Sequence, residues 1–272
     1  MRINSSNPLN LLKSTRLHSR LIFELVKRDV SGKYKGALLG SLWSIVNPVL
    51  MLTVYTFVFS VVFKMRWHNT ESSNSEFALI LFSGLIVFNM FAECLTRAPG
   101  TIVNNSSYVK KIVFPLEILP IVNMGTALLH LFISLAVWLV FHILIAGMPG
   151  PTALILPIVL LPLILMTLGI SWLLASLGVY LRDVSQVIGI VTTALMFLSP
   201  IFYPLASLPK EYQSLFLLNP LTATIEQTRT ILIYGAPPDW MHLAMSISVS
   251  LVIFLLGFAW FQRTRKGFAD VL

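Results

Sequence analysis

Residues 118–181 decide the fold: ILPIVNMGTALLHLFISLAVWLVFHILIAGMPGPTALILPIVLLPLILMTLGISWLLASLGVYL. These 64 residues contain no Asp, Glu, Lys or Arg. One crossing of a bilayer needs about 20 apolar residues, so the run is too long for one crossing and predicts two. The turn between them is expected at 147–151, Gly-Met-Pro-Gly-Pro, because glycine and proline interrupt helices. The centre of the chain therefore predicts a helical hairpin inside a membrane.

Other uncharged runs before and after this hairpin predict four more crossings. The composition agrees, because 56% of the 272 residues are hydrophobic and 11% are charged, whereas soluble domains have about 25% charged residues. The chain is expected to be an all-α integral membrane protein, with residues 1–272 forming one domain. The six predicted transmembrane helices are 36–63, 77–97, 118–146, 152–181, 186–206 and 239–262.

Basic residues are distributed unequally between the two sides that six crossings define. With the N-terminus inside, fifteen of the 19 Lys and Arg residues fall in cytoplasmic segments and four fall outside. Cytoplasmic segments of membrane proteins carry this excess of Lys and Arg. We therefore expect both termini in the cytoplasm, including a cytoplasmic tail at 263–272. Topology also accounts for the net charge of +8, so no nucleic-acid partner is predicted.

Residues 8–30 precede the first crossing and predict an amphipathic helix. Leu17, Leu21 and Leu25 recur at helical spacing, and most of the basic residues fall on another face. A basic amphipathic helix in this place is expected to lie in the cytoplasmic interface of the membrane. Two roles remain open for it: a membrane anchor alone, or an anchor that also forms the rim of a substrate entrance.

Two further segments do not cross the membrane. Residues 98–116 are polar and basic, and they predict either a solvated loop or a short helix that docks a cytoplasmic partner. Residues 207–235 mix apolar and charged residues, and they predict two short helices, 209–218 and 220–234, folded back into the outer side of the bundle. The alternative for the second segment is an ordinary outer loop. Glu226 and Arg229 are three residues apart and are expected to pair on one helix face.

The motifs of common catalytic sites are absent from the sequence. It has no GxxxxGK[ST] phosphate-binding loop, no HExxH and no GxSxG. The five histidines are scattered, and the one cysteine cannot form an intrachain disulfide or a thiolate metal cluster. We therefore expect no catalytic residue, no metal and no cofactor in this chain, and no enzymatic activity of its own.

Five stretches in a fixed order resemble a known family: GKYKGALLGSLWSIVNPVLMLTVYTFVFSVVF, SSYVKKIVFPLEILPIVNM, GVYLRDVSQVIGIVTTALMFLSPIFYP, LNPLTATIEQTRTILIYGAPPD and KGFADVL. Over residues 20–272 the chain is similar to the permease subunit of bacterial polysaccharide ABC exporters, which carry O-antigen or teichoic acid, with capsule exporters as relatives. The resemblance implies an ATP-driven exporter of a lipid-linked polysaccharide in the bacterial cytoplasmic (inner) membrane. The alternative is an ABC exporter of the same architecture for a drug, lipid or peptide.

The resemblance also implies partners and the segments that meet them. Such permeases form homodimers and work with two copies of an ATPase, which binds the ATP and Mg that this chain lacks a site for. Residues 99–113 resemble the coupling helix that meets the ATPase, 181–186 resemble a second contact, and 207–235 resemble the helices of an outer gate that holds Glu226 and Arg229. The implied ATPase-coupling residues are Asn104, Asn105, Tyr108, Lys110, Lys111 and Asp183.

The substrate expected for such a permease is a polyprenyl-diphosphate-linked glycan. Lysine and arginine bind phosphate, and the expected entrance residues are Arg28, Lys33, Tyr34, Lys35 and Arg182. Sugars slide over aromatic rings, and the expected pore-lining aromatics are Tyr55, Phe57, Phe59, Phe63, Tyr180, Phe197, Phe202 and Tyr203. Lipid-facing aromatic belts are the alternative for these rings.

The first crossing has two features that need a reason. Gly36 and Gly40 are four residues apart, a spacing that lets two helices approach closely. Pro48 interrupts the hydrogen-bond ladder of a helix, so it should kink this crossing and allow it to line a cavity.

Two other classes of membrane protein remain as alternatives. A polyprenyl-phosphate glycosyltransferase would need an acidic metal site on a cytoplasmic loop. A secondary transporter would show inverted repeats and charged residues at the centre of the membrane. The sequence shows none of these features.

Overall fold

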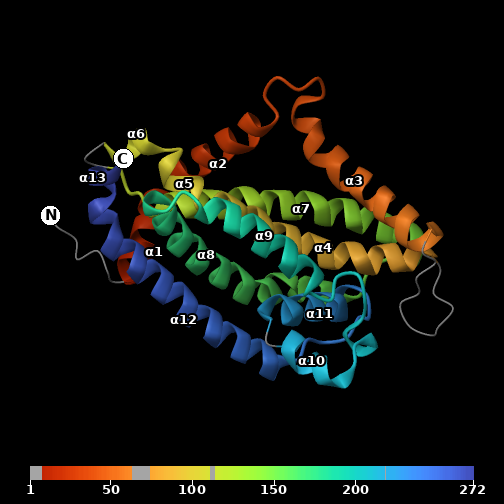
Figure 1. Ribbon diagram of the computed structural model, residues 1–272. Coiled ribbons are helices and arrows are strands. Elements are labelled where there is room, and N and C mark those ends of the chain that lie inside the picture. Colours follow the sequence, from red (N-terminus) through yellow and green to blue (C-terminus); the bar gives the residue numbers. More distant parts are fainter. Residues whose placement is uncertain (1–7, 63–73, 111–113, 218) are drawn as a thin grey trace.

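The computed structural model describes residues 8–62, 74–110, 114–217 and 219–272, and every regular element in these ranges is a helix (Figure 1). The α-helices are α1 (Pro8–Leu17), α2 (Ser19–Lys33), α3 (Trp43–Tyr55), α4 (Asn74–Arg97), α5 (Gly100–Val103), α6 (Ser106–Val109), α7 (Ile118–Ala146), α8 (Leu156–Tyr180), α9 (Val184–Phe197), α10 (Lys210–Leu217), α11 (Pro220–Leu232), α12 (Trp240–Thr264) and α13 (Phe268–Val271). A π-helical segment, Thr56–Val62, continues α3. The prediction of an all-α protein is confirmed for the described residues.

Five helical segments are long and apolar enough to cross a membrane: Gly40–Phe59, Glu76–Arg97, Ile118–Ala146, Pro151–Tyr180 and Trp240–Val271. The central hairpin lies where the uncharged run placed it, with Gly147 at a positive φ of 83° in the turn. The crossing predicted at 186–206 differs. Its helix, α9, has 14 residues and is about 21 Å long, which is shorter than the ~30 Å hydrocarbon core.

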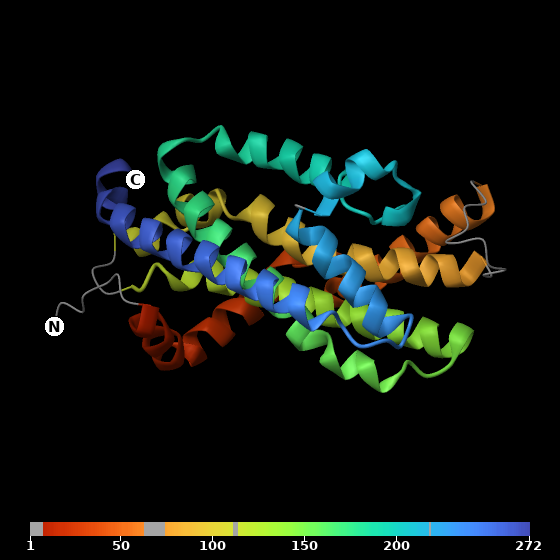
Figure 2. The same cartoon turned by 90° about the horizontal axis from the view of Figure 1, so that it is seen from below.

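The centre of the molecule is α4, most of which is buried by α7, α8, α9 and α11. Helices α8 and α12 lie side by side along most of their length (Figures 1 and 2). Their backbones touch at Gly169 and Gly257, because a Cβ atom on Gly257 would lie 2.0 Å from the Gly169 carbonyl oxygen. Small residues at such crossings let membrane helices associate through close backbone contact.

The N-terminal segment is two helices rather than the single helix predicted over 8–30, with the break at His18. The predicted apolar face is therefore only partly correct: Leu25 is buried against Ile118 and Val122 of α7, whereas Leu17 is exposed. Helix α1 packs elsewhere, and its Leu11 joins a core cluster that includes Trp172 and Phe268.

The end of α2 and the start of α3 stand away from the bundle and meet at a corner (Figure 1). Gly36 and Gly40 form this corner at φ values of 90° and 50°, which L-residues with a side chain rarely adopt. No atom lies within 4 Å of a Cβ built on either glycine. Within the described residues this pair therefore packs against no other helix of the same chain, and packing against a second copy stays a prediction. The first candidate crossing begins at Gly40. Pro48 lies inside α3 without ending it.

The two helices predicted before the last crossing are present as α10 and α11. Helix α11 begins at Pro220, and the Asn219 side chain accepts a hydrogen bond of 3.1 Å from the Leu221 N–H as its cap. One whole face of α11 is buried against α4 and α8. An ordinary outer loop is therefore excluded for this helix.

Candidate functional site

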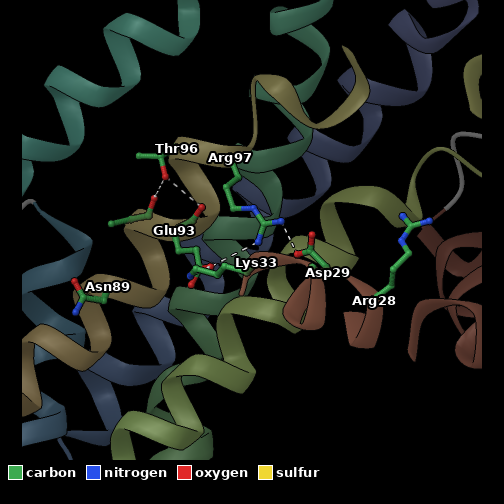
Figure 3. Close-up of a pocket in the computed structure, with 9 residues that line it drawn as sticks. Arg28, Asp29, Lys33, Asn89, Glu93, Thr96 and Arg97 are labelled. Atoms are coloured by element: carbon green, nitrogen blue, oxygen red, sulfur yellow. Dashed lines mark hydrogen bonds and ion pairs between the residues drawn. The ribbon is translucent and has the colours of Figure 1, made fainter. Parts of the chain in front are cut away.

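A cavity of about 850 Å³ lies between α2 and α4. Val26 of α2 packs against Gly125 of α7, and Leu25 packs beside it. This anchoring turns the neighbouring face of α2 toward α4. The cavity is lined by residues one helical turn apart on each helix, namely Arg28, Asp29, Gly32 and Lys33 of α2 and Asn89, Ala92, Glu93, Thr96 and Arg97 of α4 (Figure 3).

Glu93 is the centre of the charged groups in this cavity. Its Oε1 atom lies 3.3 Å from Lys33 Nζ and 3.6 Å from a guanidinium nitrogen of Arg97. Its Oε2 atom lies 2.8 Å from Nδ1 of His130 on α7. One carboxylate therefore connects three helices, α2, α4 and α7.

Asp29 forms the other acidic half of the network. Arg97 donates to Asp29 Oδ2 through its second terminal nitrogen, and Thr126 of α7 donates to the same oxygen at 2.9 Å. Arg97 thus lies between two carboxylates (Figure 3). As the last residue of α4, it also places a positive charge at the negative end of the helix dipole.

Arg28 lies at the border between this cavity and a second one. Its guanidinium points away from Glu93 (Figure 3) and donates a 2.8 Å hydrogen bond to the hydroxyl of Tyr108 on α6. The second cavity, of about 470 Å³, is lined by Arg28, Asp29 and Arg97 and extends to Asn104, Asn105 and Ser185. Cavity space therefore continues from α2 and α4 to the connection between α4 and α7.

Two of the five predicted entrance residues, Arg28 and Lys33, line the larger cavity. Tyr34 lies next to it, with its ring centre 5.8 Å from Lys33 Nζ. Lys35 and Arg182 are exposed and line neither of the two cavities.

The sequence prediction did not include Asp29, Glu93 and Arg97 in the entrance. The i, i+4 spacing of Glu93 and Arg97 was a signal for their pairing. Nothing in the sequence indicated that α2 lies against that pair, because this contact depends on tertiary packing.

The predicted pore aromatics fall into separate groups. Tyr55, Phe59, Phe197 and Phe202 form one cluster, with ring centres 5.3 Å apart for Phe59–Phe202, 5.9 Å for Phe197–Phe202 and 6.5 Å for Tyr55–Phe202. This aromatic cluster joins the end of α3 to the end of α9.

The other predicted aromatics lie outside the aromatic cluster. Phe57 lies on an exposed face, and Tyr203 packs against Phe216. Tyr180 is the last residue of α8 and packs against Phe268. Phe63 lies outside the described residues.

The predicted coupling segment contains two four-residue helices, α5 and α6, rather than one helix. Its start is packed tightly, because a Cβ atom on Gly178 of α8 would lie 2.1 Å from the Pro99 carbonyl oxygen. Asn105 donates a 2.9 Å bond to the Thr101 carbonyl. Asn104, Lys110 and Asp183 are exposed, and Lys111 lies outside the described residues.

The predicted pair of Glu226 and Arg229 is present at 2.9 Å, but Arg229 is completely buried. Its guanidinium also donates to the carbonyls of Ile80, Pro200 and Ile201. The alternative of a surface salt bridge is therefore wrong for this pair. Arg229 instead binds α11 to α4 and to the segment after α9.

The sequence is similar to those of several transport proteins. It is 27% identical over 264 residues to the O-antigen export system permease protein RfbA of Myxococcus xanthus, covering 96% of this chain and 99% of that protein. It is 28% identical over 248 residues to the polysialic acid transport protein KpsM of Escherichia coli, covering 89% and 92%. It is 22% identical over 272 residues to the capsule polysaccharide export inner-membrane protein CtrC of Neisseria meningitidis, covering 95% and 96%.

The sequence pattern of the ABC-2 type transporter family matches residues 20–233, which extend from α2 to the end of α11. The match includes the cavity between α2 and α4, the aromatic cluster and Arg229. It confirms the predicted resemblance to an ABC exporter permease and the prediction of a multi-pass transport subunit. This chain belongs to the ABC-2 type transporter family.

Proposed function

We propose that this chain is the membrane subunit of an ATP-driven exporter of a lipid-linked polysaccharide of the O-antigen or capsule type. The names of relatives that match nearly its whole length support this substrate class. The observation that carries the proposal is the cavity between α2 and α4, where Arg28, Lys33 and Arg97 place three cations. Cations of this kind bind phosphate, lysine as a point charge and arginine through its fork.

The substrate is a glycan linked to a polyprenyl diphosphate. Its diphosphate enters the cavity from the cytoplasmic side, next to Lys33 and Arg97. The glycan passes along the cluster of Tyr55, Phe59, Phe197 and Phe202, since sugar C–H groups stack on aromatic faces. The chain then advances stepwise toward the outer side as ATP is hydrolysed.

The protein has six crossings in the bacterial inner membrane and both termini in the cytoplasm. Helix α9 and the segment that follows it form the fifth crossing of the chain in two pieces. Arg229 supports this role, because its guanidinium donates hydrogen bonds to the carbonyls of Pro200 and Ile201. These carbonyls lie after the end of α9, outside the hydrogen bonds of that helix. Non-helical backbone at membrane depth requires such protein partners.

The functional unit contains two copies of this chain and two copies of an ATPase, which binds ATP and Mg. Helices α5 and α6 and the turn before α9 meet the ATPase, because they present the exposed Asn104, Lys110 and Asp183. Tyr108 of α6 joins this surface to the cavity through Arg28. Nucleotide-driven movement of α6 is thereby transmitted to α2.

The outer gate consists of α10 and α11, and the two helices have different roles. Helix α11 is fixed by the buried Arg229. In the described residues α10 contacts α11 and the segment Leu205–Ser207, and its Phe216 packs against Tyr203, whereas the contacts of α11 with α4 and α8 are more extensive. Helix α10 is therefore the part of the gate that moves.

Affinity purification of the tagged chain from native membranes in mild detergent tests the proposal. An ABC ATPase should be recovered in equal amount, and the surface polysaccharide should disappear when the chain is deleted. Lys110→Ala should reduce recovery of the ATPase, whereas Lys210→Ala should not, since Lys210 is also exposed but lies on α10 of the proposed outer gate. Recovery without an ATPase, or with one but with export of a drug or peptide instead, would overturn it.

A further inference from the structure

Glu93 is an unexpected residue in a cavity whose cations are proposed to bind phosphate. It lies one turn before the end of α4, and its Oε1 atom occupies the space between Lys33 and Arg97. A phosphate oxygen that bound both cations would need this same space. Glu93 is therefore an internal competitor of any anion in the cavity.

The contacts of Oε1 are loose enough to be exchanged. Charge-assisted bonds between nitrogen and carboxylate oxygen are usually 2.7–2.9 Å long, whereas those to Lys33 and Arg97 measure 3.3 Å and 3.6 Å. The Lys33 side chain is 46% exposed. The Glu93 side chain is 18% exposed, so an incoming anion can displace its contacts only if the carboxylate keeps another partner.

The other oxygen of Glu93 is held more tightly. His130 Nδ1 lies 2.8 Å from Oε2, and the His130 side chain is only 15% exposed. The carboxylate thus keeps a partner on α7 when Oε1 leaves the two cations. Asp29 has no such freedom, because Thr126 and Arg97 both hold its Oδ2 atom.

Whether an anion displaces Glu93 depends on the charge of that anion. A lipid with a single phosphodiester has one negative charge, so it would replace the single charge of Glu93 without electrostatic gain. A diphosphate diester has two negative charges, and it would gain attraction to Lys33 and Arg97 and to Arg28, whose described partner is the neutral Tyr108 hydroxyl. The outcome of the competition therefore depends on the number of phosphates in the head group.

We infer that Glu93 is a specificity-determining residue that makes the cavity accept diphosphate lipids and reject the single-phosphate lipids of the surrounding membrane. This inference rests on the proposed function, since it concerns the lipid end of the same substrate. Glu93 acts by occupying the site, and His130 acts by holding the displaced carboxylate.

The test compares two lipids in the complete permease–ATPase complex in phosphatidylcholine nanodiscs. The probes are phosphatidylglycerol, which has one phosphodiester, and a farnesyl-diphosphate-linked N-acetylglucosamine. Native mass spectrometry measures the dissociation constant of each. The wild-type protein should bind the diphosphate lipid and bind phosphatidylglycerol too weakly to measure. Glu93→Gln should bind each lipid at least about tenfold more tightly, so that binding of phosphatidylglycerol becomes measurable.

Two further variants separate competition from a general loss of structure. Lys33→Gln should weaken the binding of the diphosphate lipid. Glu117→Gln should keep the wild-type affinity for each lipid, because Glu117 pairs with Arg265 at 2.9 Å and lines neither of the two cavities described. If Glu93→Gln binds the two lipids no more tightly than the wild-type protein does, the inference is overturned.

Inorganic diphosphate identifies which part of the lipid is recognised. It should displace the diphosphate lipid from the wild-type complex, and a failure to do so would overturn the inference by assigning binding to the hydrocarbon chain. A failure of the proposed function would be seen in other measurements, namely the recovery of the ATPase and the surface polysaccharide. If the ATPase is recovered and the surface polysaccharide depends on this chain, but Glu93→Gln leaves the affinities for both lipids unchanged, only the inference about Glu93 falls.

Discussion

Two charged networks lie inside this helical bundle, one around Arg229 and one around Glu93, and they differ in exposure. The side chain of Arg229 is 0% exposed and binds three backbone carbonyls and Glu226. In the second network Lys33 is 46% exposed and Arg97 is 33% exposed. A buried ion is costly to leave without partners, whereas half-exposed ion pairs contribute little. The first network therefore fixes the structure, and the second can exchange partners.

The difference matches the helices that each network joins. Arg229 connects α11, α4 and the segment after α9, which are all parts of the packed core. Glu93 connects α4 and α7 to α2, which leaves the bundle a few residues later at Gly36 (Figure 1). Movement of the last turn of α2 would break the loose contact of Lys33, whereas Leu25, Val26 and Asp29 hold the preceding turns against α4 and α7.

The largest expected effect comes from removing the buried cation. Arg229→Ala would leave the carbonyls of Ile80, Pro200 and Ile201 without this donor and would also free Glu226. We expect a destabilisation of about 3–5 kcal/mol, seen as a large loss of thermal stability in detergent or of protein in the membrane. Arg229→Lys should recover part of it. Wild-type stability in Arg229→Ala would mean that this network does not fix the core.

Gly84 offers a second way to disturb the same network. A Cβ atom at this position would lie 2.9 Å from Arg229 Nη2 and 3.3 Å from Ile225. Gly84→Ala should therefore destabilise the protein by about 1–3 kcal/mol through overpacking. Gly189→Ala is the matched control in another helix, because nothing lies within 4 Å of its added methyl group. The control should stabilise α9 slightly, and equal melting temperatures for the two variants would refute this account.

Removing a cation from the network around Glu93 should affect transport more than stability, the opposite of what we expect for Arg229. Lys33→Gln should change stability by less than about 1 kcal/mol and yet strongly reduce export, measured as polysaccharide on the cell surface. Lys27→Gln is the control, since Lys27 is exposed on the same helix and does not line the cavity. If Lys33→Gln unfolds the protein as Arg229→Ala does, the contrast between the two networks is wrong.

A smaller effect is expected at the contact between α2 and α6. Tyr108→Phe keeps the ring that stacks on Phe114 at 4.3 Å but removes the hydroxyl that accepts the Arg28 hydrogen bond. The loss should be about 1 kcal/mol and should lower the stimulation of ATP hydrolysis by substrate. Basal ATP hydrolysis should stay unchanged. Tyr212→Phe, on the exposed α10, should leave both rates as in the wild type.

The smallest effect is expected at the start of α12. Asp239 caps this helix, and bonds from the His242 backbone N–H and ring lower the pKa of its carboxyl group. A lowered pKa in the folded protein means that the cap stabilises at neutral pH and is lost as the pH falls through that pKa. Asp239→Asn should keep the cap but remove this acid dependence, seen in melting temperatures across acidic pH. An identical pH profile in both proteins would contradict the assignment.

The sequence was informative where one physical rule acts alone. The long uncharged runs located the central hairpin closely, with 118–146 and 152–181 predicted and Ile118–Ala146 and Pro151–Tyr180 observed. It was less informative where two rules conflict. Gly36 and Gly40 have the spacing of a helix-packing pair, but their positive φ values form a corner instead. The periodicity of residues 8–30 continues across His18, where the helix is broken.

The candidate site could be predicted only in part for the same reason. Basic residues before a crossing indicated Arg28 and Lys33, and both line the cavity. Glu93 could be paired with Arg97 from spacing, but its contact with Lys33 spans 60 residues of sequence. That contact exists because Leu25 and Val26 dock α2 on α7, which no local pattern reveals.

Transport by the purified complex tests the central claim most directly. The permease and its ATPase would be reconstituted in liposomes that contain a diphosphate-linked oligosaccharide lipid, and its transfer across the bilayer would be measured by loss of accessibility to an added glycosidase. The account predicts ATP-dependent transfer that Lys33→Gln abolishes and Lys27→Gln preserves. ATP hydrolysis without transfer of this lipid, or transfer that is unaffected by Lys33→Gln, would contradict it.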